Sequence, residues 1–160
     1  KKTPYGTVTK NVDGRKRHIV VDSLGLLLAV LVTAANVDDA RAAAELFGRL
    51  QGQPVGKVRR MLADNKYHNY ALYAWVEDNA SWELVIVRRP EGEQGWVDLP
   101  LRWTVERTFA WLGKCRRLSK DHERSVLSSE AFIKLAMIHL MLNRLAPKDI
   151  DPEFMYRPAA

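Results

Sequence analysis

Two short β-rich runs near the start of the chain constrain the fold most strongly. Residues 18–22 and 26–33 are rich in β-branched and aliphatic side chains, and Ser23-Leu24-Gly25 joins them. This arrangement predicts a β-hairpin in which Gly25 supplies the positive φ of the turn. The second run is apolar throughout, so we expect other elements to cover both of its faces.

The rest of the chain alternates between helical and β-rich stretches. Apolar residues recur at helical spacing after Asn36-Val37-Asp38-Asp39, where Asp38 or Asp39 would cap a helix. The other predicted elements are a strand over 58–63, a helix over 67–78, a strand over 82–87, a polar loop over 91–100, a helix over about 101–117 and a final helix ending at 145. This order predicts an α/β domain over residues 1–146, with an irregular tail over 147–160.

Side-chain spacing predicts the buried faces of the last two helices. In the first of them, Val105, Phe109 and Leu112 recur on one stripe, which we expect to be buried. Ser128 or Ser129 is expected to cap the final helix. That helix is apolar nearly all round, so we expect it to lie across a face of a sheet.

Basic side chains are concentrated in two blocks of the sequence. The 160 residues carry 25 Lys and Arg against 19 Asp and Glu, a net charge of +6. Residues 1–18 hold six basic side chains against one acid, and residues 102–124 hold seven against three. Such clustering favours a surface for a polyanion, nucleic acid first, with a solvated cationic face as the alternative. The second block is rich in arginine, whose guanidinium suits phosphate.

Composition also bears on the cellular compartment. Cys115 is the one cysteine, which rules out an internal disulfide framework and suits a reducing cytosol. The longest apolar runs, residues 26–32 and 135–142, are far shorter than the roughly 20 residues of a membrane span. The start of the chain has no apolar region typical of a signal peptide. We therefore expect a cytoplasmic protein without a membrane partner.

Two acids are candidates for chemistry. Asp64 follows a predicted strand, and Glu106 lies in a predicted helix where Arg102, Ala110 and Gly113 share its face. The small residues on that face leave room for a bulky ligand. One interpretation is that Glu106 holds a metal ion while nearby arginines hold phosphates. The other is that Arg102 and Glu106 form an ordinary surface ion pair.

Several segments, in collinear order from about residue 10 to 146, resemble one protein family. The longest is Leu99-Pro-Leu-Arg-Trp-Thr-Val-Glu-Arg-Thr-Phe-Ala-Trp-Leu-Gly-Lys-Cys-Arg-Arg-Leu118, and the others lie at 14–25, 36–39, 63–64 and 129–145. They resemble the DDE transposases of bacterial insertion sequences, of the IS-five type. The resemblance implies an RNase H-like fold, a mixed sheet flanked by helices.

This resemblance assigns roles to the two acids. Asp64 is similar to the second acid of the DDE triad and Glu106 to the third, so both would be catalytic residues and metal ligands. Arg102 matches the arginine of the signature around that glutamate, and Lys114 or Arg117 stands in for its downstream basic position.

The chain departs from the family pattern at two places near these acids. Leu99 stands where the signature has a tyrosine. Asn65-Lys66 follows Asp64, where the family usually has two small residues, and this puts a cation beside the metal site.

The first acid of the triad has no counterpart that we recognise. In the family it lies on the first core strand, and neither Asp13 nor Asp22 matches it. We therefore expect a chain that lacks this strand and leaves two sheet edges facing a gap. A separately made N-terminal half, a second copy of the chain (as a homodimer) or residues 3–10 could fill that gap.

The family reaction is phosphoryl transfer on DNA. Two Mg²⁺ (or Mn²⁺) ions bridge the scissile phosphate, and three carboxylates supply the oxygen ligands that such ions prefer. The DNA partner would be the ends of the element and the target. The DNA-binding residues that we predict come from both basic blocks: Arg15, Lys16, Arg17, Arg102, Arg107, Lys114, Arg116 and Arg117.

Three functions stay open. The first is DNA transposition in the bacterial cytoplasm, at the nucleoid, by a catalytic domain that is incomplete in this chain, so activity of the chain alone is undecided. The second is a non-catalytic DNA-binding or regulatory remnant, whose salt-sensitive binding survives loss of Asp64 and Glu106. The third is a structural assembly module without affinity for DNA.

Overall fold

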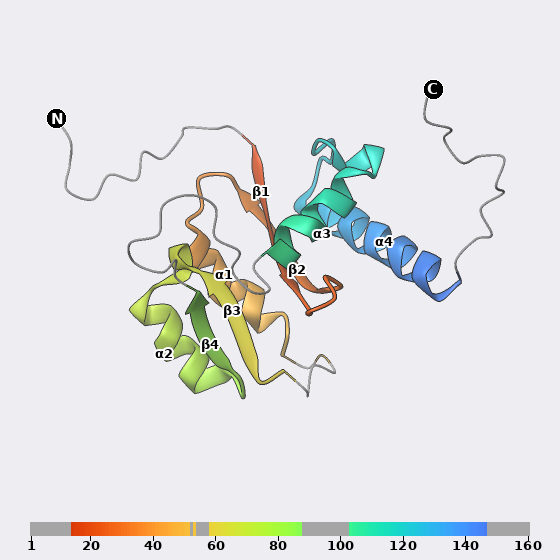
Figure 1. The fold of residues 1–160 in the computed structure, drawn as a ribbon. Helices are drawn as coiled ribbons and strands as arrows, with labels where there is room; N and C mark the ends of the chain where they lie inside the picture. Colours follow the sequence, from red (N-terminus) through yellow and green to blue (C-terminus); the bar gives the residue numbers. More distant parts are fainter. Residues whose placement is uncertain (1–13, 52, 54–57, 88–102, 147–160) are drawn as a thin grey trace, which may run out of the picture.

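Strands and helices alternate along the chain, as the sequence predicts (Figure 1). The structure is a computed structural model that describes residues 14–51, 53, 58–87 and 103–146. The elements are β1 (Arg15–Val21), β2 (Leu27–Ala34), α1 (Asp39–Gly48), β3 (Arg60–Asp64), the 3₁₀ helix η1 (Asn65–Tyr67), α2 (Tyr70–Asn79), β4 (Glu83–Val87), α3 (Trp103–Gly113), the 3₁₀ helix η2 (Arg116–Leu118) and α4 (Val126–Leu145). The predicted loop over 91–100 and tail over 147–160 lie outside the described residues.

The predicted β-hairpin is confirmed. Strands β1 and β2 pair antiparallel, and the turn between them contains Gly25 at φ +82°. The Asp22 carboxylate accepts hydrogen bonds from the backbone N–H groups of Leu24 (2.9 Å) and Leu26 (2.8 Å), which stabilises the turn. A left-handed residue is required at Gly25, and glycine adopts that conformation without steric cost.

Both faces of β2 are covered, because alternate side chains enter two different cores. Ala29 and Leu31 pack with α1 and α2, whereas Val30 and Val32 pack with α3, η2 and α4. Successive strand residues point to opposite faces, so an uninterrupted apolar run can serve two layers at once. The prediction that other elements cover both faces of this run is therefore confirmed.

The second pair of strands is parallel. β3 pairs with β4, with α2 as the connecting helix, and α1 contacts β1 and β2 as well as α2 and η1. Within the described ranges the strands form two separate two-stranded sheets, β1–β2 and β3–β4. The result is a mixed α/β arrangement in which helices flank small sheets (Figure 1).

The buried face of α3 matches the predicted stripe only in part. Leu112 is buried as predicted and Phe109 is half-buried against the same core, whereas Val105 is 37% exposed and Thr104 and Thr108 are buried instead. The reason is the close approach of the β1–β2 turn, where the Thr108 hydroxyl donates to the Gly25 carbonyl at 2.9 Å. A small polar side chain satisfies this backbone group, and a larger apolar one would not. The helix also ends at Gly113, before the predicted residue 117.

The cap of α4 lies upstream of the predicted serines. Ser125 is the N-cap, and its hydroxyl accepts from the Ser128 N–H at 3.0 Å. Ser129 is buried instead and donates its hydroxyl to Asp121 at 3.1 Å. The helix lies against β2 through Ile133 and Met137, which agrees with the expected position on a sheet face.

One face of α4 remains exposed and apolar. Leu135, Ile138, Leu142 and Leu145 lie on this face. By length and composition alone, α4 is long and apolar enough to cross a membrane, unlike the shorter apolar runs considered in the sequence. Core helices of soluble proteins have the same length and composition. The packing of its other face on β2 is that of a core helix.

Candidate functional site

Asp64 is the last residue of β3 and is half-buried. Its carboxylate accepts from the Asn65 N–H at 2.7 Å and caps η1, so the chain turns immediately after the acid. The sequence prediction of an acid at a strand end is confirmed. The position of Asp64 is therefore fixed by β3 before it and by η1 after it.

The pKa of Tyr67 is affected by the acids near this strand end. Burial, followed by the charges of Asp39, Asp64 and Asp38, raises the pKa of Tyr67 to about 12. Carboxylates disfavour a second negative charge nearby, so these acids act on a common region. The 3₁₀ helix η1, which follows Asp64, contacts α1, and Asp38 is the N-cap of α1.

Glu106 is exposed in the first turn of α3. Ala110 and Gly113 on the same helix are also exposed, and a Cβ added at Gly113 would meet no atom within 4 Å. The open face predicted beside this acid is therefore present. Arg102, the proposed partner of Glu106, lies outside the described residues.

The described residues contain no cluster of three or more His, Cys, Asp or Glu side chains placed to hold a metal ion. Asp64 and Glu106 offer carboxylate oxygens, which are suitable ligands for Mg²⁺. Two carboxylates are fewer donors than a two-metal centre needs. Within 14–51, 53, 58–87 and 103–146, no larger group of such donors is assembled.

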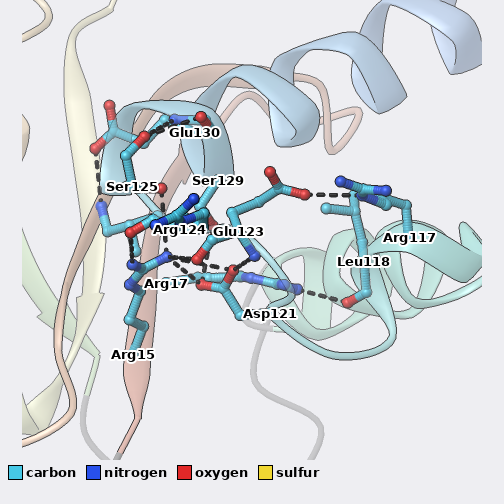
Figure 2. Close-up of polar contacts among 12 residues, drawn as sticks. Arg15, Arg17, Arg117, Leu118, Asp121, Glu123, Arg124, Ser125, Ser129 and Glu130 are labelled. Carbon is cyan, nitrogen blue, oxygen red and sulfur yellow. Dashed lines mark hydrogen bonds and ion pairs between the residues drawn. The ribbon is translucent and has the colours of Figure 1, made fainter.

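The described basic residues of the first block bond to other parts of the protein (Figure 2). Arg15 forms an ion pair with Asp121 at 3.3 Å and donates to the backbone carbonyls of Glu123, Arg124 and Ser125 at 2.8–3.3 Å. These contacts join β1 to a segment more than 100 positions away in the sequence. A guanidinium with this many internal acceptors has few donors left for DNA.

Asp121 is the carboxylate at the centre of that network. Burial alone would raise the pKa of Asp121, but hydrogen bonds from the Glu123 N–H and the Ser129 hydroxyl, together with the charge of Arg15, hold it below its usual value. The ionised form is thus the one that the fold stabilises. The network is a structural clamp between β1 and the start of α4.

Lys16 and Arg17 are also committed to internal partners. Lys16 donates to Asp39 and to the Val37 carbonyl, both at 2.8 Å. Arg17 donates to the Leu118 carbonyl at 2.8 Å (Figure 2). The three predicted DNA-binding residues of the first block therefore hold β1 to α1, η2 and the start of α4.

The basic residues of the second block have mixed surroundings. Arg117 pairs with Glu123 at 2.8 Å and lies 4.8 Å from the centroid of the Phe132 ring. Arg107 lies between two tryptophan rings of α3 and makes no ion pair within the described ranges. Lys114 and Arg116 are exposed. Of the predicted DNA-binding residues in the described part of this block, Arg107, Lys114 and Arg116 are therefore those without an ion pair to another described residue.

Sequence reasoning missed a buried charge network around Glu130. This carboxylate, 4% exposed on α4, accepts from Arg49 at 2.7 Å and from the Val32 N–H at 3.0 Å. Arg49 also donates to the Val30 carbonyl at 2.7 Å. The one available signal was a charged residue at the start of an otherwise apolar helix.

Comparison with known proteins identifies a family that matches this chain. The model of the family described as "Transposase DDE domain" matches residues 1–141. A curated relative from Burkholderia cepacia, "Putative transposase for insertion sequence element IS402", is 34% identical in an alignment of 142 residues that covers 85% of this chain and 66% of the relative. The chain thus spans just under two thirds of that relative's length. No solved structure matches this chain.

The match covers most of the chain, including both candidate acids, the hairpin and nearly all of α4. The chain therefore belongs to the transposase DDE domain family. The resemblance to DDE transposases of insertion sequences, drawn above from short segments, is confirmed. Proteins of this family act in DNA transposition and in general use divalent metal ions.

Proposed function

We propose that this chain is part of the catalytic domain of a DNA transposase that cleaves and joins DNA by metal-dependent phosphoryl transfer. The observation that carries the proposal is the placement of the two acids. Asp64 ends a β-strand, and Glu106 lies 42 positions later on an open helix face lined by small residues. Both lie in the segment that matches the family.

We assign Asp64 and Glu106 as the second and third acids of the triad and as metal ligands. Mg²⁺ or Mn²⁺ held by them would supply Lewis-acid stabilisation of the charge that develops on the scissile phosphate. The chain's own contribution is to hold each carboxylate in place. The β3–η1 turn holds Asp64, and the first turn of α3 presents Glu106 to solvent.

We further propose that the two sheets belong to one RNase H-like sheet. Among the described residues, β1 pairs only with β2 and β3 pairs only with β4, so each pair has a free edge. An added strand between β1 and β3 would satisfy both edges and join the antiparallel pair to the parallel pair. That strand would also bring the first acid.

The source of the strand is a separate part of the proposal. An N-terminal transposase half is our first candidate, because in the family the first acid lies on the first core strand. A second copy of the chain in a homodimer is the alternative partner. Residues 3–10, the third candidate, lie outside the described residues.

The test combines metal binding with DNA nicking. The chain is assayed on supercoiled DNA with Mg²⁺ or Mn²⁺, alone and with the N-terminal part of a longer family member. We expect nicking only in the mixture, and we expect Asp64→Asn and Glu106→Gln to abolish it. Asp78→Asn, which changes an exposed acid on α2, is the matched control and should leave activity unchanged. Nicking that survives either site substitution would overturn the assignment.

A second candidate is a DNA-binding remnant without catalysis. The observation that favours it is Lys66, a cation in η1 two positions after Asp64. In this case DNA binding is salt-sensitive and persists in both site variants. The mixture would show no nicking with either metal ion.

A further inference from the structure

Two tryptophans and two arginines form a continuous stack across α3 and α4. The Arg107 guanidinium lies 4.2 Å from the centroid of the Trp103 ring and 4.8 Å from that of Trp111. Arg144 of α4 lies 4.5 Å from the same Trp111 ring. Residues 103, 107 and 111 are four apart, so they lie on one face of the helix. We call these four residues the Trp–Arg stack.

The two arginines of this stack differ from the other arginines that contact rings or acids. Arg15, Arg49 and Arg117 each pair with a carboxylate. Within the described ranges neither Arg107 nor Arg144 makes an ion pair, and the Arg107 Nε is buried without a hydrogen-bond partner. Neither charge is therefore balanced by an acidic partner among the described residues. Positive charge of this kind favours an anionic ligand.

The stack is also held rigidly. A Cβ at Gly25 would lie 2.8 Å from the Trp111 ring, so this ring is packed closely against the β1–β2 turn. Stacking fixes the plane of each guanidinium. A side chain that is already ordered loses less entropy when a ligand binds. Planar guanidinium groups match the geometry of phosphate oxygens.

We propose that the Trp–Arg stack binds the phosphate backbone of DNA, with Arg107 and Arg144 as the phosphate-contacting residues. This inference rests on the proposed function for the choice of DNA. Two cations from two helices suit a repeating polyanion better than a single small phosphate. Trp103 is 51% exposed, and Lys114 and Arg116, which follow α3 in the chain, are also exposed. The bound backbone would pass close to Glu106, the neighbour of Arg107 in α3.

The direct test is the salt dependence of DNA binding. Binding of a fluorescent 30-base-pair duplex by the 160-residue chain is measured by anisotropy over a range of NaCl concentrations. Each lost phosphate contact lowers the slope of log Kd against log salt by about 1. We expect this fall for Arg107→Gln and for Arg144→Gln, and a fall of about 2 for the double variant. Arg41→Gln, an exposed arginine on α1, is the matched control and should keep the wild-type slope.

Trp103→Leu tests the role of the ring separately from the charge. It keeps both arginines but removes one ring from Arg107. We expect roughly 2- to 10-fold weaker binding at an unchanged salt slope, because only the ordering of the guanidinium is lost. Circular dichroism and thermal melting of each variant establish that the fold is retained.

Four results would overturn the proposal. The first is a wild-type slope and affinity in both arginine variants, with or without a lower melting temperature, since a purely structural stack gives that result. The second is no DNA binding by the wild-type chain. The third is a loss of inorganic phosphate binding in the variants while duplex DNA binding stays the same. The fourth is a preference for an RNA duplex that both variants abolish. Failure of metal-dependent nicking with these slopes intact would instead reject only the proposed catalysis.

Discussion

The β1–β2 hairpin and the β3–β4 pair share α1 but are held in different ways. The hairpin is bonded by charged side chains to distant segments, through Arg15 to Asp121 and through Glu130 to Val32. The β3–β4 pair contacts the rest of the described molecule chiefly by apolar packing of residues such as Met61 and Leu84.

This difference bears on the candidate site. Asp64 lies on β3, in the strand pair that depends on apolar packing, whereas Arg15 and Arg17 lie on β1 of the hairpin. Regions with fewer anchoring contacts open more readily. We therefore expect the strand that carries the acid to respond most to whatever completes the sheet.

The largest expected effect comes from the core beneath β3–β4. Leu72 of α2 is 3% exposed, and Leu72→Ala would leave a cavity in this core. We expect a loss of about 3 kcal/mol in the free energy of unfolding, measured with urea. Leu127→Ala, at an exposed leucine of α4, should change it by less than about 0.5 kcal/mol. Equal losses in the two variants would contradict the assigned core.

The second prediction weakens the polar anchoring of the hairpin. Glu130→Gln removes the charge that Arg49 and the Val32 N–H contact, and we expect a loss of about 2–3 kcal/mol in urea unfolding. Arg49 has a partly exposed side chain, which places the effect at the low end for a buried pair. Glu45→Gln removes the exposed partner of Arg49 and should cost less than about 0.5 kcal/mol. Faster amide exchange confined to β3–β4 in Glu130→Gln would contradict the anchoring role.

The third prediction concerns the contact between the hairpin turn and α3. Gly25→Ala places a Cβ 2.8 Å from the Trp111 ring at a φ of +82°, so we expect a loss of about 2 kcal/mol in thermal and urea unfolding. Gly113→Ala meets no atom within 4 Å, and we expect it to stabilise the chain by up to about 1 kcal/mol. A neutral Gly25→Ala would show that the turn and α3 are not in contact.

The smallest expected effect is a pH dependence of the free energy of unfolding that comes from His18 in β1. Burial lowers the pKa of His18, with Asp39 opposing the shift and Lys16 adding to it, while the ring is hydrogen-bonded to Thr33 at 2.9 Å. The unfolded chain therefore binds a proton at His18 more readily than the folded chain, and stability falls as pH drops through about 6.5.

Urea unfolding between about pH 7.5 and about pH 5.5 tests this sign. His18→Gln should flatten the dependence. His139→Gln, at an exposed histidine of α4, should leave it unchanged. A wild-type chain that gains stability on acidification over this range would contradict the assigned direction.

Local sequence patterns predicted the order of the elements well. The turn at Gly25, a helix cap at Asp38 or Asp39 and a strand that leads to Asp64 all follow from the conformations that neighbouring residues permit, and Asp38 is the cap in the structure. The apolar run of β2 also showed correctly that both faces are covered. Such features depend on contacts within a few residues, which the sequence records directly.

The patterns were less successful where distant segments meet. Thr104 and Thr108 are buried in place of Val105 because the hairpin turn needs a hydroxyl against its backbone. The cap of α4 is Ser125 because Ser129 is turned inward to Asp121. Neither choice is visible in the spacing of apolar residues along one helix.

The sequence thus accounts for the α/β order, for the positions of Asp64 and Glu106 and for membership of the transposase family. The folded structure alone separates the arginines that hold distant segments together from those that make no ion pair among the described residues. Arg15 and Arg107 look equivalent in a count of charge, yet one has an acid and three carbonyls as partners and the other has two aromatic rings. The physical reason is that an ion pair is set by proximity in space, and here the partners lie up to 106 residues apart in the chain.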